Sequence, residues 1–223
     1  MGPHDTQPIA HAGAPLEGAD AVMIMVHGRN ASPASILSLG DAIDRPRVAC
    51  IAPGAAGGTW YPYSFLAPRE QNEPGLSSAL GVLESLVTGL IARGVPSRRI
   101  VLLGFSQGAC LSAEFALRHP RRYGGVLVLS GGLIGPPGTT WDDVAGTLGG
   151  TPVFLGCSDV DGHIPKERVI ESEHVLTRLG ADVKRTLYPG MGHLVNEDEL
   201  VEVRAVLDAA LGEASGSFGP NAR

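Results

Sequence analysis

The sequence has little of what would mark a nucleic-acid-binding, exported or membrane-spanning protein. Its 223 residues include 17 Lys or Arg against 23 Asp or Glu, and the net charge of -6 argues against a nucleic-acid partner. The first residues lack a basic segment followed by an apolar one, and no stretch reads as about 18 uncharged apolar residues. We therefore expect no export signal, no stable membrane insertion and a cytoplasmic location.

Cysteine is also scarce. Cys50, Cys110 and Cys157 lie in or beside apolar runs, and their spacing is not that of a metal site. This pattern predicts buried thiols in a reducing compartment. We expect no metal and no organic cofactor.

Short apolar runs that alternate with helical patterns are what the sequence does contain. Runs such as 21–26 and 125–129 are continuously apolar, which is typical of strands covered on both faces. Between 73 and 93, leucine and valine recur at helical spacing, and Gly94-Val95-Pro96 then ends the helix. The other expected strands are 47–53, 100–103, 152–155 and 183–188, and the other expected helices begin at Ser32-Pro33 or cover 109–119, 166–179 and 197–211.

This alternation predicts one α/β domain over residues 21–211, with a mainly parallel central sheet and helices on both faces. Residues 1–20 have no regular period, so we expect a poorly ordered segment or a short edge strand near Pro8–His11. Residues 212–223 are rich in Gly, Ser and Ala and are expected to form a disordered tail.

A candidate nucleophile lies in Gly104-Phe105-Ser106-Gln107-Gly108, which matches G-x-S-x-G. An apolar run precedes the motif and an Ala- and Leu-rich helix follows it, as a strand-to-helix turn requires. Such a turn exposes Ser106 at a helix N-terminus, where amide groups favour a developing negative charge. The motif therefore indicates nucleophilic catalysis by Ser106.

A serine hydroxyl needs a base to remove its proton, and His193 is the histidine best placed for this role. It lies in the glycine-rich loop between the last strand and the last helix, and it comes last in the order Ser, Asp, His. The acid that orients the imidazole should lie in the loop after strand 152–155. Asp159 and Asp161 both lie there, and the residues alone leave the two open.

Acyl transfer also needs donors for the oxyanion. The backbone amides of Gln107, after the nucleophile, and of Arg29, in His27-Gly28-Arg29, are the predicted pair. His27 has no accompanying metal-ligand pattern, so we interpret it as a hydrogen-bonded anchor of its loop.

Taken together, these motifs make the chain resemble the phospholipase/carboxylesterase family of α/β-hydrolases over about residues 21–211. The resemblance rests on His27-Gly28, Trp60-Tyr61, the serine motif, Asp161 to Pro165 and Gly190 to His193. In that family the acid is followed four positions later by proline, which Asp161 fits and Asp159 does not. The resemblance therefore favours Asp161. The chain departs from the family's thioesterases at Arg29-Asn30 and at Gly162.

The resemblance further implies a site without a large cap domain. The implied substrate contacts are Trp60, Tyr61, Phe65, Leu133 and Trp141. We expect a serine carboxylesterase for short to medium acyl esters, with a small-molecule ester as its partner. The alternatives are a lysophospholipase, an acyl thioesterase or a non-catalytic binding protein with this fold. A homodimer is compatible with the sequence.

Overall fold

Seven strands form one sheet in the computed structural model, which describes residues 2–215. The sheet has the order β1-β3-β2-β4-β5-β6-β7 and is parallel except for β1 at its edge, as the sequence predicts. The strands are β1 (Ile9–Gly13), β2 (Ala21–Val26), β3 (Val48–Pro53), β4 (Ile100–Phe105), β5 (Gly125–Leu129), β6 (Pro152–Ser158) and β7 (Asp182–Tyr188).

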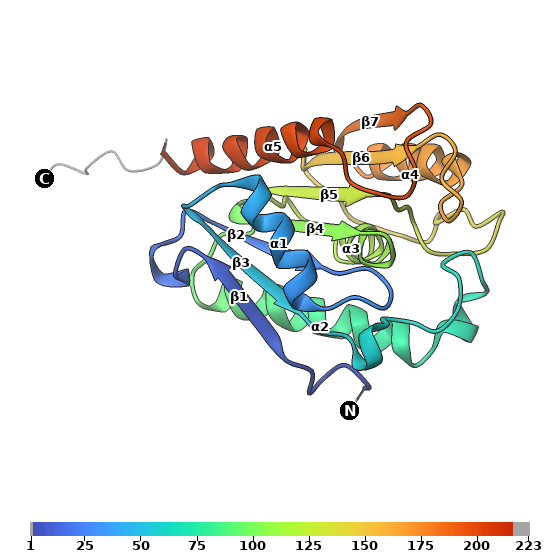
Figure 1. Cartoon of the computed structure of the whole chain (residues 1–223), viewed down its shortest axis with the longest axis horizontal. Helices are drawn as coiled ribbons and strands as arrows, with labels where there is room; N and C mark the ends of the chain where they lie inside the picture. Colours follow the sequence, from blue (N-terminus) through green and yellow to red (C-terminus); the bar gives the residue numbers. More distant parts are fainter. Residues whose placement is uncertain (1, 216–223) are drawn as a thin grey trace, which may run out of the picture.

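Helices cover both faces of the sheet, so the predicted single-domain α/β class is confirmed (Figure 1). One face carries α1 (Pro33–Ile43) and α5 (Glu197–Ser215), and the other carries α2 (Gly75–Ala92), α3 (Gln107–Arg118) and α4 (Lys166–Arg178). Alternate side chains of each inner strand supply the two cores, because successive strand residues point to opposite faces. In β2, for example, Val22 and Ile24 face α2 and α3, whereas Met23 and Met25 face α1.

Both ends of the described chain have regular structure beyond residues 21–211. The N-terminal stretch contains the edge strand β1 at Ile9–Gly13, paired with β3, and His4 before it is 3% exposed. At the other end, α5 continues to Ser215, four residues into the segment for which we predicted a tail. Gly212 to Ser215 are therefore helical, and residues 216–223 lie outside the described part of the chain.

Helix α2 corrects our statement that no segment is long and apolar enough to cross a membrane. It has 18 residues and a mean hydropathy of 1.5, which meets that criterion by length and composition. In the structure its apolar side chains, among them Leu76, Leu83 and Val87, are buried in the core. Such burial is what the core helix of a folded domain shows, and it explains the apolar composition.

The parallel strands all end at the same edge of the sheet. Because β2, β4, β6 and β7 are parallel, the loops that follow them leave from this edge, and each carries one of the polar motifs. The loop of residues 54–72, after β3, joins them there and contains two short 3-10 helices. The fold thus gathers residues distant in sequence at one place.

Candidate active site

Ser106 lies at a strained turn between β4 and α3. Its φ of 55° and ψ of -120° are outside the ordinary regions for a residue with a Cβ, and such conformations persist where function demands them. The flanking glycines are needed because a Cβ on Gly104 would lie 2.2 Å from the Gly108 carbonyl oxygen, and one on Gly108 would lie 2.0 Å from that of Val26. The turn holds Ser106 at the first turn of α3, facing a cavity.

His193 connects Ser106 to a buried carboxylate. Its Nε2 lies 2.8 Å from Ser106 Oγ, and its Nδ1 lies 2.7 Å from Asp161 Oδ2. The tautomer with hydrogen on Nδ1 satisfies both contacts, since Nδ1 then donates to the carboxylate and Nε2 accepts from the hydroxyl. The rings of Phe105 and His163 pack at 5.0 Å and 4.8 Å from the imidazole and help to hold it.

The two aspartates of the loop after β6 have different partners. Asp161 is buried, and its Oδ1 accepts hydrogen bonds from the backbone N–H groups of His163 and Ile164 while Oδ2 faces His193. Asp159 instead accepts from the backbone N–H of Gly190, at 2.8 Å. The structure therefore brings Asp161 to the imidazole, whereas Asp159 binds the loop that carries His193.

The surroundings of Asp161 keep its carboxylate ionised at neutral pH. Burial raises its pKa. The hydrogen bond from His193 and those from the backbone N–H groups of His163 and Ile164 lower the pKa by more than burial raises it. The net pKa lies below the usual aspartate value. An ionised carboxylate at this position can stabilise an imidazolium on His193.

Two backbone N–H groups complete the site. Within the described residues, the amides of Arg29 and Gln107 donate to no other protein group. Both residues line the same cavity as Ser106, at the end of the β2–α1 loop and at the start of α3. Unused donors beside a nucleophile are what a tetrahedral oxyanion requires.

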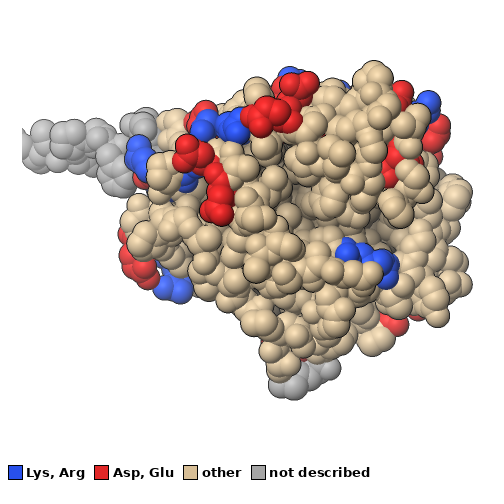
Figure 2. All heavy atoms as spheres, in the orientation of Figure 1, with Lys and Arg blue, Asp and Glu red and all other residues tan. Residues whose placement is uncertain are grey.

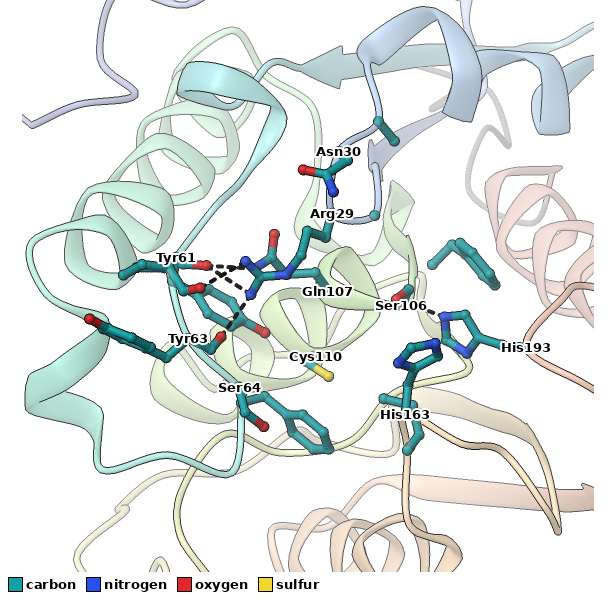
Figure 3. A pocket seen from close by; sticks show the side chains of 16 residues that line it. Arg29, Asn30, Tyr61, Tyr63, Ser64, Ser106, Gln107, Cys110, His163 and His193 are labelled. Atoms are coloured by element: carbon teal, nitrogen blue, oxygen red, sulfur yellow. Dashed lines mark hydrogen bonds between the residues drawn. The ribbon is translucent and has the colours of Figure 1, made fainter.

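The side chains of these same two residues bind one segment, Trp60 to Tyr63. Gln107 accepts from the Trp60 N–H at 2.9 Å and donates to the Tyr61 carbonyl at 2.8 Å. Arg29 donates to the carbonyls of Tyr61, Pro62 and Tyr63, at 3.0, 2.9 and 2.7 Å (Figure 3). The Tyr61 carbonyl thus accepts from both side chains. We call residues 60–63 the bridging segment. The sequence analysis used only the backbone of Arg29 and Gln107 and missed this second role.

Two histidines, His4 and His27, hold the bridging segment through hydrogen bonds with Trp60. His27 bonds the Gly28 carbonyl and accepts from the Ala55 N–H, which makes it the loop anchor that we expected. Burial lowers its pKa, so it stays neutral as this pairing requires. The Trp60 indole donates to the His27 carbonyl at 2.9 Å, and His4 Nε2 bonds the Trp60 carbonyl at 2.8 Å. No periodic pattern around His4 could have indicated this contact.

The expected substrate contacts divide into two groups. Tyr61 and Phe65 line the cavity. Trp60, Leu133 and Trp141 do not, and this part of the prediction needs correction. All three belong to the buried core: Trp60 packs between His4 and His27, and Trp141 stacks on the Arg168 guanidinium. Their apolar bulk is used in packing the loops.

The cavity beside Ser106 has a volume of about 550 Å³ and is open to solvent. Figure 2 shows a hollow on this face of the molecule, with one patch of basic atoms beside it. Lining residues that the sequence analysis did not single out include Asn30, Tyr63, Ser64, Phe105, Cys110 and His163 (Figure 3). Phe105 ends β4, Cys110 lies in α3 and the other four lie in loops, and at none of these positions does the residue type alone indicate a substrate contact.

The cysteines are free and buried, as predicted. Cys110 contacts the cavity, but burial raises its pKa to about 12, so the thiol stays protonated. Cys50 and Cys157 have pKa values raised by burial to about 11 and about 12. None of the three thiols is therefore activated as a nucleophile.

Comparison with known proteins agrees with this geometry. A family model described as phospholipase/carboxylesterase matches residues 9–211. A solved phospholipase/carboxylesterase from Dyadobacter fermentans is 38% identical, with a TM-score of 0.88 over 93% of this chain and 98% of its own. Esterase PE8, at 24% identity and a TM-score of 0.75, shares the fold.

Two curated relatives are fungal proteins named acyl-protein thioesterase 1. The one from Gibberella zeae is 34% identical over 142 residues, which is 62% of this chain and 60% of the relative. The one from Eremothecium gossypii is 32% identical over 155 residues, which is 66% of this chain and 64% of the relative. The matches thus span less than two thirds of these relatives.

Proposed function

The chain belongs to the phospholipase/carboxylesterase family, and from this premise we propose that it is a serine carboxylesterase acting on short to medium acyl esters. Members of the family are serine hydrolases that act on ester or thioester bonds. The observation that carries the proposal is the continuous hydrogen-bonded series from Ser106 through His193 to Asp161, beside an open cavity.

In the proposed reaction, His193 Nε2 takes the proton of Ser106 as Oγ bonds to the ester carbonyl carbon. The amides of Arg29 and Gln107 donate to the resulting oxyanion. When the carbon–oxygen bond to the alcohol breaks, His193 returns its proton to the leaving oxygen. His193 then takes a proton from water as the water oxygen bonds to the acyl carbon. It returns this proton to Ser106 Oγ as the bond between Oγ and the acyl carbon breaks, which releases the acid.

The cavity supports the proposed range of acyl lengths. A volume of about 550 Å³ suits a small molecule, and Tyr61 and Phe65 offer it apolar contacts. A thioester is the second candidate, because the two curated relatives are named acyl-protein thioesterases. A lysophospholipid would use the same residues.

We also propose a cytoplasmic location, because three free thiols suit a reducing compartment. A homodimer is a further proposal, and size-exclusion chromatography with light scattering tests it.

A fluorophosphonate probe tests the proposal. We expect one adduct by intact mass on the wild type and none on Ser106→Ala, with turnover of a 4-nitrophenyl ester series only by the wild type. The series should show an optimum at short to medium acyl chains. If the wild type forms no adduct and turns over no ester or thioester, the chain is a non-catalytic binding protein.

A further inference from the structure

Arg29 carries a positive charge that no carboxylate compensates. Most arginines in the described residues pair with a carboxylate: Arg45, Arg47, Arg69, Arg93, Arg118, Arg168, Arg178, Arg185 and Arg204. Arg29, by contrast, has no carboxylate within ion-pair distance in the part of the chain that the structure describes. Its acceptors are three neutral carbonyls, which orient the guanidinium and leave its full charge in place.

The guanidinium is also held at a fixed position. Three hydrogen bonds to consecutive carbonyls define its plane, and its Cζ lies 5.9 Å from the centre of the Tyr61 ring. A guanidinium has five N–H donors, so three bonds do not use all of them. Because the three hydrogen bonds already order this long side chain, binding a ligand does not have to offset the loss of its conformational entropy.

The cavity around Arg29 has no negative charge of its own. Its lining residues include no Asp or Glu, although the whole chain has a net charge of -6. Of the buried carboxylates close by, Glu114 bonds the two arginines Arg69 and Arg118, and Asp161 bonds Nδ1 of His193, whose Nε2 faces Ser106. Among the described residues that line the cavity, Arg29 is therefore the only Arg, Lys, Asp or Glu.

We propose that the site selects esters that carry an anionic group, a carboxylate or a phosphate, on the part of the substrate that reaches from Ser106 toward Arg29. In Figure 3 the Arg29 guanidinium lies beside Tyr61 and Tyr63, on the side of the cavity away from His193. A substrate bonded at Ser106 that extends along this cavity, which Phe65 and Cys110 also line, would approach the cation. This inference rests on the proposed esterase function and names its substrate class.

The first test uses two substrates that differ only in charge: mono-4-nitrophenyl adipate, with a free carboxylate, and 4-nitrophenyl methyl adipate. We expect the wild type to have a kcat/KM about tenfold higher for the anion at low ionic strength, and the ratio to decrease as salt is added. The ratio is measured on one protein sample, so a loss of activity common to both substrates cancels.

Variants assign the preference to Arg29. Arg29→Gln keeps donors for the carbonyls but removes the charge, and its ratio should decrease to about one. Arg29→Lys keeps the charge and should retain most of the preference. Arg98→Gln removes a charge before β4, at the opposite edge of the sheet, and should keep the wild-type ratio. A preference that survives in Arg29→Gln would overturn the assignment.

A second pair of substrates distinguishes the two anions. A 1-acylglycerol 3-phosphate is compared with the 1-monoacylglycerol of the same chain, both below their aggregation concentrations. A preference in either pair that depends on Arg29 supports the proposal and identifies the anion. Equal turnover of both members of both pairs overturns it while the esterase function stands. If the fluorophosphonate adduct and all turnover are absent, the esterase function fails and this inference fails with it.

Discussion

Gln107 shows how one residue can serve the reaction twice. Its backbone N–H is available to an oxyanion, and its side chain bonds the N–H of Trp60 and the carbonyl of Tyr61. The carbonyl and NH2 groups of the glutamine amide match these partners, and the residue is 5% exposed. The backbone that carries this N–H is therefore held by the side chain of the same residue.

Gln107→Leu should lower kcat while the protein stays folded. The variant keeps the backbone N–H and loses both side-chain hydrogen bonds, so the bridging segment shifts and the donor is misaligned; we expect a decrease of about tenfold to a hundredfold. KM for a 4-nitrophenyl ester should change little. Gln71→Leu, an exposed change in the same long loop, is the control. Unchanged kcat in Gln107→Leu would show that the bridging segment does not position the donor.

At the scale of elements, the first turn of α5 holds a buried carboxyl group. Glu199 and Asn196 exchange hydrogen bonds through their backbone N–H groups and side chains, as in a capping box. The second carboxyl oxygen of Glu199 has no partner among the described residues and lies against Gly156 of β6. Burial raises the pKa of Glu199 to about 7, and the Asn196 N–H lowers it only in part.

Because its pKa is higher in the folded protein, Glu199 contributes stability at low pH and loses it as the pH rises through about 7. We expect the free energy of unfolding of the wild type, relative to Glu199→Gln, to decrease by up to about 3 kcal/mol between pH about 4.5 and about 8. Urea denaturation across this range measures it. Asp198→Asn, exposed in the same turn, should show no such trend. A pH-independent difference between wild type and Glu199→Gln would contradict the expectation.

The elements were predictable because the pattern of apolar residues reports burial directly. The limits of β2 and β5 match the apolar runs 21–26 and 125–129, since fully buried strands have no polar positions to blur their ends. The turn at Ser106 was predictable for a different reason: only glycine fits at 104 and 108. Helix α5 passes its predicted end because alanine and glutamate after Gly212 favour helix.

The site was predictable only where a motif fixes the local backbone. Nothing local distinguishes Asp159 from Asp161, because both bond the loop about 30 residues away and differ only in whether the partner is Gly190 or His193. Aromatic residues in a loop are equally ambiguous, because Trp60 and Tyr61 are neighbours and only one of them lines the cavity. The side-chain contacts of Arg29 and His4 join distant segments, so no sequence window contains both partners.

At the scale of the whole molecule, the N-terminal segment is part of the site's support. His4 bonds the Trp60 carbonyl and the Ala56 N–H, and β1 covers the edge of β3. Uncovered strand edges pair with other chains. The N-terminal segment therefore covers the edge of the sheet and, through His4, adds a further hydrogen bond to the bridging segment beside those of Arg29 and Gln107.

Removal of residues 2–13 should lower the free energy of unfolding by at least about 2 kcal/mol, because the hydrogen bonds of His4 and the ladder between β1 and β3 are lost. The truncated protein should also associate through β3. Urea denaturation and size-exclusion chromatography with light scattering measure the two effects. His11→Ala, an exposed change within β1, is the control. A truncated protein with wild-type stability and molecular mass would show that the edge strand is dispensable.

The bridging segment has a consequence for how this enzyme can be altered. Tyr61 to Tyr63 line the cavity, and their carbonyls bind the side chains of Arg29 and Gln107, the two residues whose amides we propose as oxyanion donors. Variants of Tyr61 to Tyr63 that are selected to accept a new acyl group should therefore also change kcat, because they change the contacts of Arg29 and Gln107. Improved variants should therefore need compensating changes at Arg29 or Gln107, with strong epistasis between the two places. We therefore expect changes in the acyl group that is accepted to be accompanied by changes in the rate of the reaction.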